Sequence, residues 1–254
     1  MTKKYPSEWF EARKERARES ARAVLPIVFG YIAPSSVVDI GCGTGSWLLV
    51  ASELGIVDIL GLDAPHVDPR LLEIPADRFV RHDLTKQTAV GRTFDLALCM
   101  EVGEHLPPAL APLLVKSLTE LAPVVLFSAA VPGQGGTAHV NEQWPEYWAN
   151  LFAERGYRSY DAIRSRVWRN EQVRYFYAQN SLLYVRASES SRYPGLPAPL
   201  SDVPLALIHP KLFARVRDTF PPPGAITLSS LIRFAAKWFA RGPFADPRTR
   251  GERR

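Results

Sequence analysis

The residues best suited to proton transfer lie in the segment VPGQGGTAHVNEQW, residues 131–144. Imidazole exchanges protons near neutral pH, and His139 stands here beside Asn141, Glu142 and Gln143. The glycines let the backbone approach a ligand closely. Burying this many polar groups is costly unless they take part in binding or catalysis. We therefore predict that His139 is a general base, a role worth about 100- to 10,000-fold in rate. A loop histidine that caps the following helix is the alternative interpretation.

A second polar group closes the segment FDLALCMEVGEHLP, residues 94–107. Glu101 and His105 follow an apolar run that reads as a strand, so we expect them to face a cleft and assist the base. A structural role for His105, in the turn before a proline, is equally compatible with the pattern. Glu101, His105, His139 and Glu142 together raise a divalent-metal hypothesis, with Mg²⁺ as one candidate. No tight ligand spacing supports it, so the metal stays unassigned.

A glycine loop, VVDIGCGTGSW, residues 37–47, raises the question of a cofactor. The loop lacks the Gly-Lys-Ser/Thr ending of a phosphate-binding P-loop and fits the dinucleotide pattern poorly. Asp63 follows the second strand, where a carboxylate can accept from both ribose hydroxyls, and Asp83 follows the third, placed to receive an adenine amino group. Carboxylates without clustered lysine or arginine favour an adenosyl group that carries a cationic sulfonium.

In this ordered set of motifs the sequence resembles the class I S-adenosylmethionine-dependent methyltransferases, over roughly residues 37–185. The resemblance implies an α/β, Rossmann-like, doubly wound sheet of seven strands with the last strand antiparallel. It implies that the methionine and ribose end of S-adenosylmethionine is lined by Asp39, Gly41, Cys42, Gly43 and Gly45. Asp63 would hold the ribose, Asp83 and Leu84 would flank the adenine, and Met100 and Glu101 would close over the donor.

Aromatic residues with polar tips follow the predicted base. Trp144 and Tyr177, with Asn141, Glu142 and Gln143, suit an uncharged polyhydroxyl acceptor, whereas the spacing of Trp148 and Phe152 predicts core packing. The segments GGTAHVNEQWPEYW and YFYAQN are similar to those of bacterial sugar O-methyltransferases, in particular the mycobacterial enzymes of methylmannose polysaccharide assembly. That resemblance implies O-methylation of a mono- or oligosaccharide with His139 as base.

These residues must be positioned by strands that alternate with helices. The apolar runs predict strands at residues 36–40, 57–62, 79–81, 94–99, 124–128, 157–163 and 181–185. Helical spacing predicts helices from residue 7 to about 30, with a break or kink at Pro26, and at residues 46–54, 107–121 and 145–155. The alternation predicts a parallel sheet covered on both faces, with ligands beyond the carboxyl ends of its strands.

Charge and composition divide the chain into a methyltransferase domain, residues 1–187, and an extension, residues 188–254. The extension carries eleven Lys and Arg against five Asp and Glu, and ten of the 22 prolines. We expect short helices there at residues 210–218 and 228–241, and disorder at the end. The nearly neutral remainder argues against a nucleic-acid partner.

The rest of the composition limits where the protein works. The longest apolar runs fall short of a membrane span, and Cys42 and Cys99, the only cysteines, read as interior, so we expect a cytoplasmic protein. A homodimer is compatible with the sequence. The alternatives that stay open are a methyltransferase of another small molecule, a lipid or RNA, and a non-catalytic S-adenosylmethionine-binding subunit.

Overall fold

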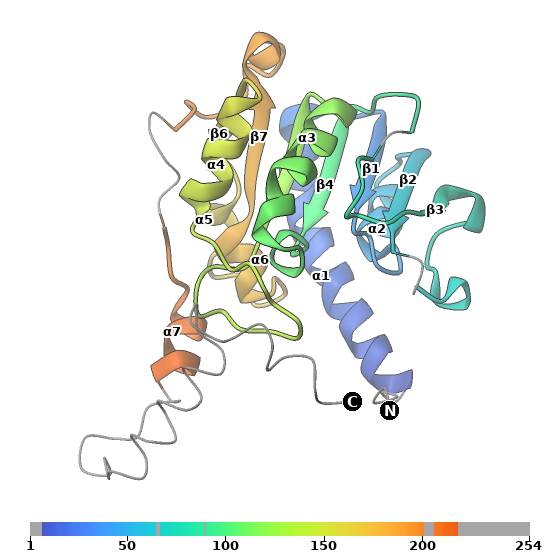
Figure 1. Ribbon diagram of the computed structural model, residues 1–254, viewed down its shortest axis with the longest axis vertical. Coiled ribbons are helices and arrows are strands. Elements are labelled where there is room, and N and C mark those ends of the chain that lie inside the picture. Colours follow the sequence, from blue (N-terminus) through green and yellow to red (C-terminus); the bar gives the residue numbers. More distant parts are fainter. Residues whose placement is uncertain (1–6, 65–66, 89, 201–205, 218–254) are drawn as a thin grey trace.

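Seven strands form one sheet in the computed structural model, which describes residues 7–64, 67–88, 90–200 and 206–217 (Figure 1). The strands are β1 (Ser36–Ile40), β2 (Asp58–Asp63), β3 (Phe79–Arg81), β4 (Leu96–Met100), β5 (Val124–Ser128), β6 (Tyr157–Tyr160) and β7 (Leu182–Arg186). The α-helices are α1 (Ser7–Ile32), α2 (Ser46–Glu53), α3 (Ala111–Leu121), α4 (Pro145–Glu154), α5 (Arg164–Val167), α6 (Tyr175–Asn180) and α7 (Pro210–Arg217). Short 3-10 turns are η1 (Pro69–Leu71), η2 (Ala76–Arg78), η3 (Gly103–His105), η4 (Pro108–Leu110) and η5 (Ala187–Arg192).

The strand order is β3-β2-β1-β4-β5-β7-β6. β1 to β5 are parallel, and β7 pairs antiparallel with both β5 and β6. This confirms the predicted doubly wound sheet of seven strands with the last strand antiparallel. Because β1 lies between β2 and β4, the direction of winding reverses beside it, and open α/β sheets bind their ligands at such a switch point.

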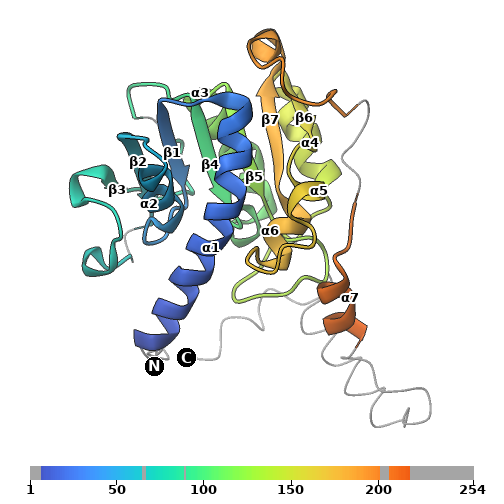
Figure 2. The same cartoon turned by 180° about the vertical axis from the view of Figure 1, so that it is seen from behind.

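Helices cover both faces of the sheet, as continuous apolar strands require. One buried cluster joins alternate strand residues to α1, α2, α5 and α6, and a second joins the other residues to α3 and α4. Figures 1 and 2 show these two layers, and they show that the N-terminal part of α1 projects past the carboxyl ends of the strands. α1 therefore reaches the edge of the sheet where ligands are expected.

Most predicted elements lie within a few residues of their observed positions, but three predictions need correction. Of the break or kink predicted at Pro26, the break does not occur: α1 runs through Pro26, and its buried apolar face, packed on the sheet, offsets the lost backbone hydrogen bond. The strand expected at residues 157–163 ends at Tyr160. The helices α5 and α6 were not predicted, since both are too short to show a helical period.

The described segment at residues 206–217 packs against α6 and Trp168. α7 agrees with the helix predicted at residues 210–218, and Leu212 and His209 are buried. The helix predicted at residues 228–241 and the disorder expected after it lie outside the described residues. Within the part of the chain that the structure describes, no helix has the length and apolarity needed to cross a bilayer.

Candidate functional site

The predicted cofactor loop turns sharply between β1 and α2. Gly41, Gly43 and Gly45 have φ of 78°, 57° and 91°, a region that residues with a Cβ rarely adopt. At Gly45 a Cβ would also stand 2.9 Å from Cγ1 of Ile74. The glycines are thus required by backbone conformation and by close packing at the carboxyl end of β1.

Two acidic residues flank this loop in the sheet. Asp39 is buried in β1, where burial and the charge of Asp63 raise its pKa well above the usual value. Asp63 ends β2 and accepts hydrogen bonds from the N–H groups of Gly43 and Ala64, both at 2.6 Å. The structure therefore brings together Asp39, Asp63 and the glycine loop, as the sequence predicts.

The remaining predicted cofactor residues differ in their burial and contacts. Asp83 follows β3 and accepts from the Thr85 hydroxyl at 2.7 Å and its N–H at 3.0 Å, which lower the pKa of Asp83. Leu84 packs partly against the α3–α4 cluster, and Met100 is buried at the end of β4. Cys42 is a buried free thiol, and burial raises its pKa. It is a packing residue, not an activated nucleophile.

Glu101 anchors a network of amides at the end of β4. Its Oε2 accepts from Gln134 Nε2 at 2.6 Å and its Oε1 from Asn180 Nδ2 at 3.0 Å. Asn180 also donates to Gln134 Oε1 at 2.9 Å, so the three side chains form a closed set. Glu101 has φ of 58°, and a non-glycine residue in this region marks stored strain that is common at functional sites. Burial raises the pKa of Glu101.

Glu104 is a buried carboxyl in the turn that follows β4. The residue is fully buried in η3, and neither carboxylate oxygen accepts a hydrogen bond from the described residues. Burial, with the charge of Glu101 as the next contribution, raises the pKa of Glu104 to about 9. With a pKa this high, Glu104 holds a proton at neutral pH, next to the Glu101 carboxyl and with one oxygen 4.0 Å from Nε2 of His139.

His139 faces Glu104 from the loop between β5 and α4. Its Nδ1 lies 2.8 Å from Glu142 Oε1 and its Nε2 lies 4.0 Å from Glu104 Oε1. Glu142 also accepts from the N–H groups of Gly133 at 2.8 Å and Gly135 at 2.6 Å. Burial alone would raise the pKa of Glu142, but the bonds from His139 and these amides outweigh it and lower the pKa. An ionised Glu142 fixes the tautomer that leaves Nε2 free to accept a proton.

His105 forms a cluster with Glu104 and His139. Its ring meets that of His139 edge to face, with centroids 5.0 Å apart, and Ala138 next to His139 has φ of 59°. One ligand atom each from Glu104, His105 and His139 lies within 4.8 Å of the others. Two imidazoles and one carboxylate form a set that suits a divalent cation. This corrects the set predicted from sequence, because Glu101 and Glu142 are engaged by other residues and Glu104 takes their place.

The predicted acceptor residues differ in their exposure. Asn141 is buried and donates to the Gly103 carbonyl at 3.4 Å, and its Oδ1 accepts from Gln143 Nε2 at 2.9 Å. Both amides therefore hold the loop in place. Trp144 is 43% exposed, and Tyr177 packs edge to face on Trp47 with centroids 5.2 Å apart. Trp144 and Tyr177 thus have different surroundings, one exposed and one packed.

The core assignments within this segment are confirmed. Trp148 and Phe152 are 2% and 0% exposed, and the Trp148 ring lies so close to Gly103 that a Cβ there would stand 2.6 Å from its Cη2. The packing of α4 on Gly103 fixes the turn that carries Glu104 and His105.

Sequence reasoning gave no role to Glu104 or Gln134. One signal for Glu104 was present: it lies three residues after Glu101 and directly before His105, a spacing that one tight turn can bring to one side. Asn180 ends the segment YFYAQN and was expected among the polar groups beside the acceptor, whereas the structure shows it bonded to Glu101 and Gln134. Nothing local marks Gln134, because its role comes from contacts between distant segments.

Comparisons with known proteins identify the fold. The sequence profile of a family described as "Methyltransferase domain" matches residues 10–172. A curated relative, ribosomal RNA large subunit methyltransferase E of Caulobacter sp. (strain K31), is 49% identical over 35 residues, which are 14% of this chain and 16% of that protein. The match thus spans about a sixth of the relative's length.

Two solved structures share the architecture. The sugar N-methyltransferase KedS8 from Streptoalloteichus sp. is 15% identical with a TM-score of 0.54, covering 73% of this chain and 97% of that one. CalS10, an amino pentose methyltransferase from Micromonospora echinaspora solved with S-adenosylmethionine bound, is 16% identical with a TM-score of 0.51, covering 73% and 99%. At these identities the likeness shows the fold.

Proposed function

The chain belongs to the methyltransferase domain family and uses S-adenosylmethionine, and we propose that it methylates a hydroxyl of a mono- or oligosaccharide with His139 as general base. The observation that carries this proposal is the His139–Glu142 pair, whose free Nε2 faces the Glu104 and His105 side of the loop. The names of KedS8 and CalS10 refer to sugar or amino pentose methylation, which agrees with a saccharide acceptor.

The proposed mechanism assigns a step to each part of the site. The glycine loop and Asp63 would hold S-adenosylmethionine, which would supply an electrophilic methyl group on its sulfonium and be released as S-adenosylhomocysteine. Nε2 of His139 takes the proton of the acceptor hydroxyl as its oxygen attacks, and Glu142 at Nδ1 stabilises the imidazolium. Alignment of the two reactants in such a site is worth about 7–11 kcal/mol. The Glu101–Gln134–Asn180 network keeps the end of β4 in place.

A metal-assisted version rests on a specific observation, the unpartnered carboxylate of Glu104 beside two imidazoles. Glu104, His105 and His139 would be the ligands, and the bound cation would lower the pKa of the acceptor hydroxyl. His139 Nε2 cannot ligate a cation and accept a proton at once, so the two versions exclude each other.

We further propose that residues 1–187 form the catalytic domain, residues 188–254 an extension, and that the protein acts in the cytoplasm, where buried free thiols such as Cys42 and Cys99 stay reduced. Trp144 at the rim of the His139 loop is the aromatic surface for the sugar ring.

The test uses methyl-labelled S-adenosylmethionine and a cell extract split into carbohydrate, RNA and lipid fractions. Wild-type protein and His139→Ala run side by side, each with EDTA and with Mg²⁺ or Mn²⁺ restored, and donor binding is measured by calorimetry. Label in carbohydrate that His139→Ala loses, with donor binding intact and no effect of EDTA, supports the general base. Loss with EDTA that the metal restores assigns the cluster to a cation.

Other outcomes overturn parts of the proposal. Label in RNA or lipid replaces the acceptor class, and equal labelling by both proteins removes His139 from the mechanism. Donor binding without transfer to any fraction supports the alternative of a non-catalytic S-adenosylmethionine-binding subunit.

A further inference from the structure

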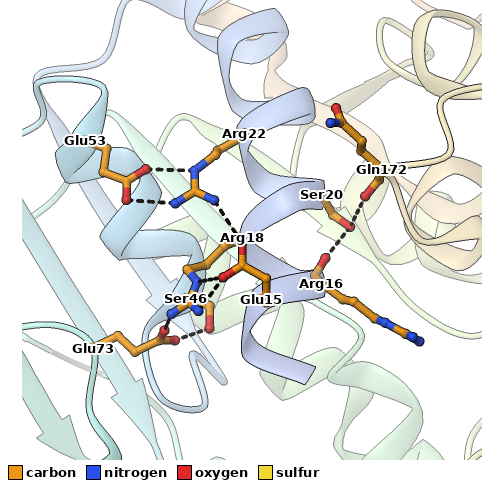
Figure 3. A network of polar contacts seen from close by, with 9 residues as sticks. All are labelled: Glu15, Arg16, Arg18, Ser20, Arg22, Ser46, Glu53, Glu73 and Gln172. Carbon is orange, nitrogen blue, oxygen red and sulfur yellow. Dashed lines mark hydrogen bonds and ion pairs between the residues drawn. The ribbon is translucent and has the colours of Figure 1, made fainter. Parts of the chain in front are cut away.

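Glu73, from the segment between η1 and η2, binds the cofactor loop and α1 at once (Figure 3). Its Oε2 accepts from the hydroxyls of Ser46 and, at 3.2 Å, Thr44, and its N–H donates to the Thr44 carbonyl at 2.8 Å. Its Oε1 forms an ion pair with Arg18 of α1. The Glu73 side chain is 7% exposed and that of Arg18 19%, so water screens this pair little.

Two residues further along, α1 binds a segment on the other side of the site. Ser20 is fully buried, and its Oγ accepts from the Arg174 N–H at 3.1 Å and lies 3.4 Å from the Gln172 carbonyl. Arg174 directly precedes α6, and the α6 residue Asn180 donates to Glu101. Figure 3 shows Arg18 and Ser20 extending from one stretch of α1 toward these two segments.

We propose that α1 couples the two halves of the site: Glu73 positions the cofactor loop, and α1 transmits its state, through Arg18 and Ser20, to the segment at residues 170–174 that leads into α6. The positions i and i+2 on a helix point to nearly opposite sides, so one rigid turn spans both contacts. A donor that orders the loop at residues 43–46 therefore also orders the start of α6. Asn180 at the other end of this short helix donates to Glu101, so the ordering reaches the acceptor side of the site.

A nearby ion pair offers a control that distinguishes this coupling from general stabilisation of α1. Arg22 binds Glu53 at 3.0 Å through two nitrogens and so also joins α1 to α2, but Glu53 contacts no residue of the glycine loop in these hydrogen bonds. Arg22→Met removes this ion pair and the contact of Arg22 Nη1 with Glu15 Oε1 at 3.3 Å, while the contacts of Glu73 with Arg18, Ser46 and Thr44 stay in place. It is the matched control for Arg18→Met.

The experiment measures amide hydrogen exchange of the full chain with and without S-adenosylhomocysteine, whose affinity is obtained by calorimetry. In the wild type we expect protection at both residues 43–46 and residues 170–178. Arg18→Met and Glu73→Gln should weaken S-adenosylhomocysteine binding by about tenfold and lose protection at residues 170–178. Ser20→Ala should keep donor affinity within about twofold and lose only that distant protection, whereas Arg22→Met should keep both.

Arg18→Lys is the rescue variant, because it retains the charge that pairs with Glu73. It should restore protection at residues 170–178, which a variant with an unfolded α1 would not do. Protection at residues 170–178 that persists in Arg18→Met and Ser20→Ala overturns the coupling, as does wild-type protection confined to the loop. Because no acceptor is used, failure of this test is distinct from failure of the saccharide assignment.

Discussion

At the scale of single residues, the site combines a buried carboxyl that lacks hydrogen bonds with two strained backbone conformations. Glu104 is fully buried without a hydrogen bond, and Glu101 and Ala138 beside it adopt positive φ. Such features reduce stability and persist only where the surrounding structure fixes them. The residue cluster that we assign to chemistry is thus also the place where replacing an ionisable group should stabilise the fold.

Glu104→Gln is expected to stabilise the protein increasingly as pH rises. The folded pKa of about 9 lies above the unfolded value of about 4.3, so between these pH values unfolding releases a proton and stability falls with pH. The variant has no proton to release, and its Tm should exceed that of the wild type more at pH 8 than at pH 5. Thermal scans with EDTA measure this, with the exposed Glu154→Gln as control. A gain in Tm that does not depend on pH would contradict the explanation.

Gly45→Ala should weaken S-adenosylmethionine binding by about tenfold or more, because the new Cβ meets Ile74 and the residue is forced out of the left-handed region. Gly55→Ala is the control, since Gly55 has φ of 98° but open space around its Cβ. Both variants should lose about 1–2 kcal/mol of stability, and only Gly45→Ala should lose donor affinity. Equal donor affinity in calorimetry would show that the loop does not contact the donor.

At the scale of elements, α6 joins the site to the C-terminal extension. Gln179 is buried, accepts from the His209 N–H at 2.7 Å, and donates to Asn180 Oδ1 at 2.9 Å. His209 in turn uses both ring nitrogens, one beside the Trp168 carbonyl at 3.0 Å and one accepting from the Lys211 N–H at 3.1 Å. The docking of α7 and the orientation of Asn180 therefore depend on one amide.

Gln179→Ala should loosen α7 and lower stability by about 1–3 kcal/mol, the usual cost of leaving a buried N–H unsatisfied. Faster hydrogen exchange at residues 209–217, with the central strands unchanged, is the expected result. Gln87→Ala removes an amide of the same size that bonds Glu120 on the surface, at 2.9 Å, and should change little. Unchanged exchange in the Gln179 variant would mean that α7 is held by its apolar face alone.

Elements encoded by local sequence could be predicted, whereas those that depend on contacts between distant segments could not. Strands β1, β4 and β5 could be predicted because each is a buried apolar run, and the glycine loop because its spacing is fixed by backbone conformation. The short α6 and the contacts of Gln134 and Asn180 could not, because their stability comes from residues far apart in the chain. His139 was predicted from its own loop, whereas Glu104 gains significance only when that loop meets η3.

At the scale of the whole molecule, residues 206–217 pack on α6: the His209 N–H donates to Gln179, and Arg215 donates to the Tyr175 hydroxyl at 2.9 Å. Ending the chain after residue 200 removes the buried residues Leu212 and His209. The acceptor Michaelis constant should then rise or activity be lost, while S-adenosylmethionine binding on the opposite side remains. Ending the chain after Arg217 keeps α7 and is the matched control. Unchanged kinetics after the longer deletion would refute a role for the extension in acceptor binding.

The position of β7 has a consequence for synthesis. β7 is the last strand made, yet it lies between β5 and β6, so β6 finds no partner and β5 keeps an open edge until residues 182–186 leave the ribosome. An open edge strand is a template for association with other chains. Until β7 is inserted, both β5 and β6 can therefore pair with strands of other copies.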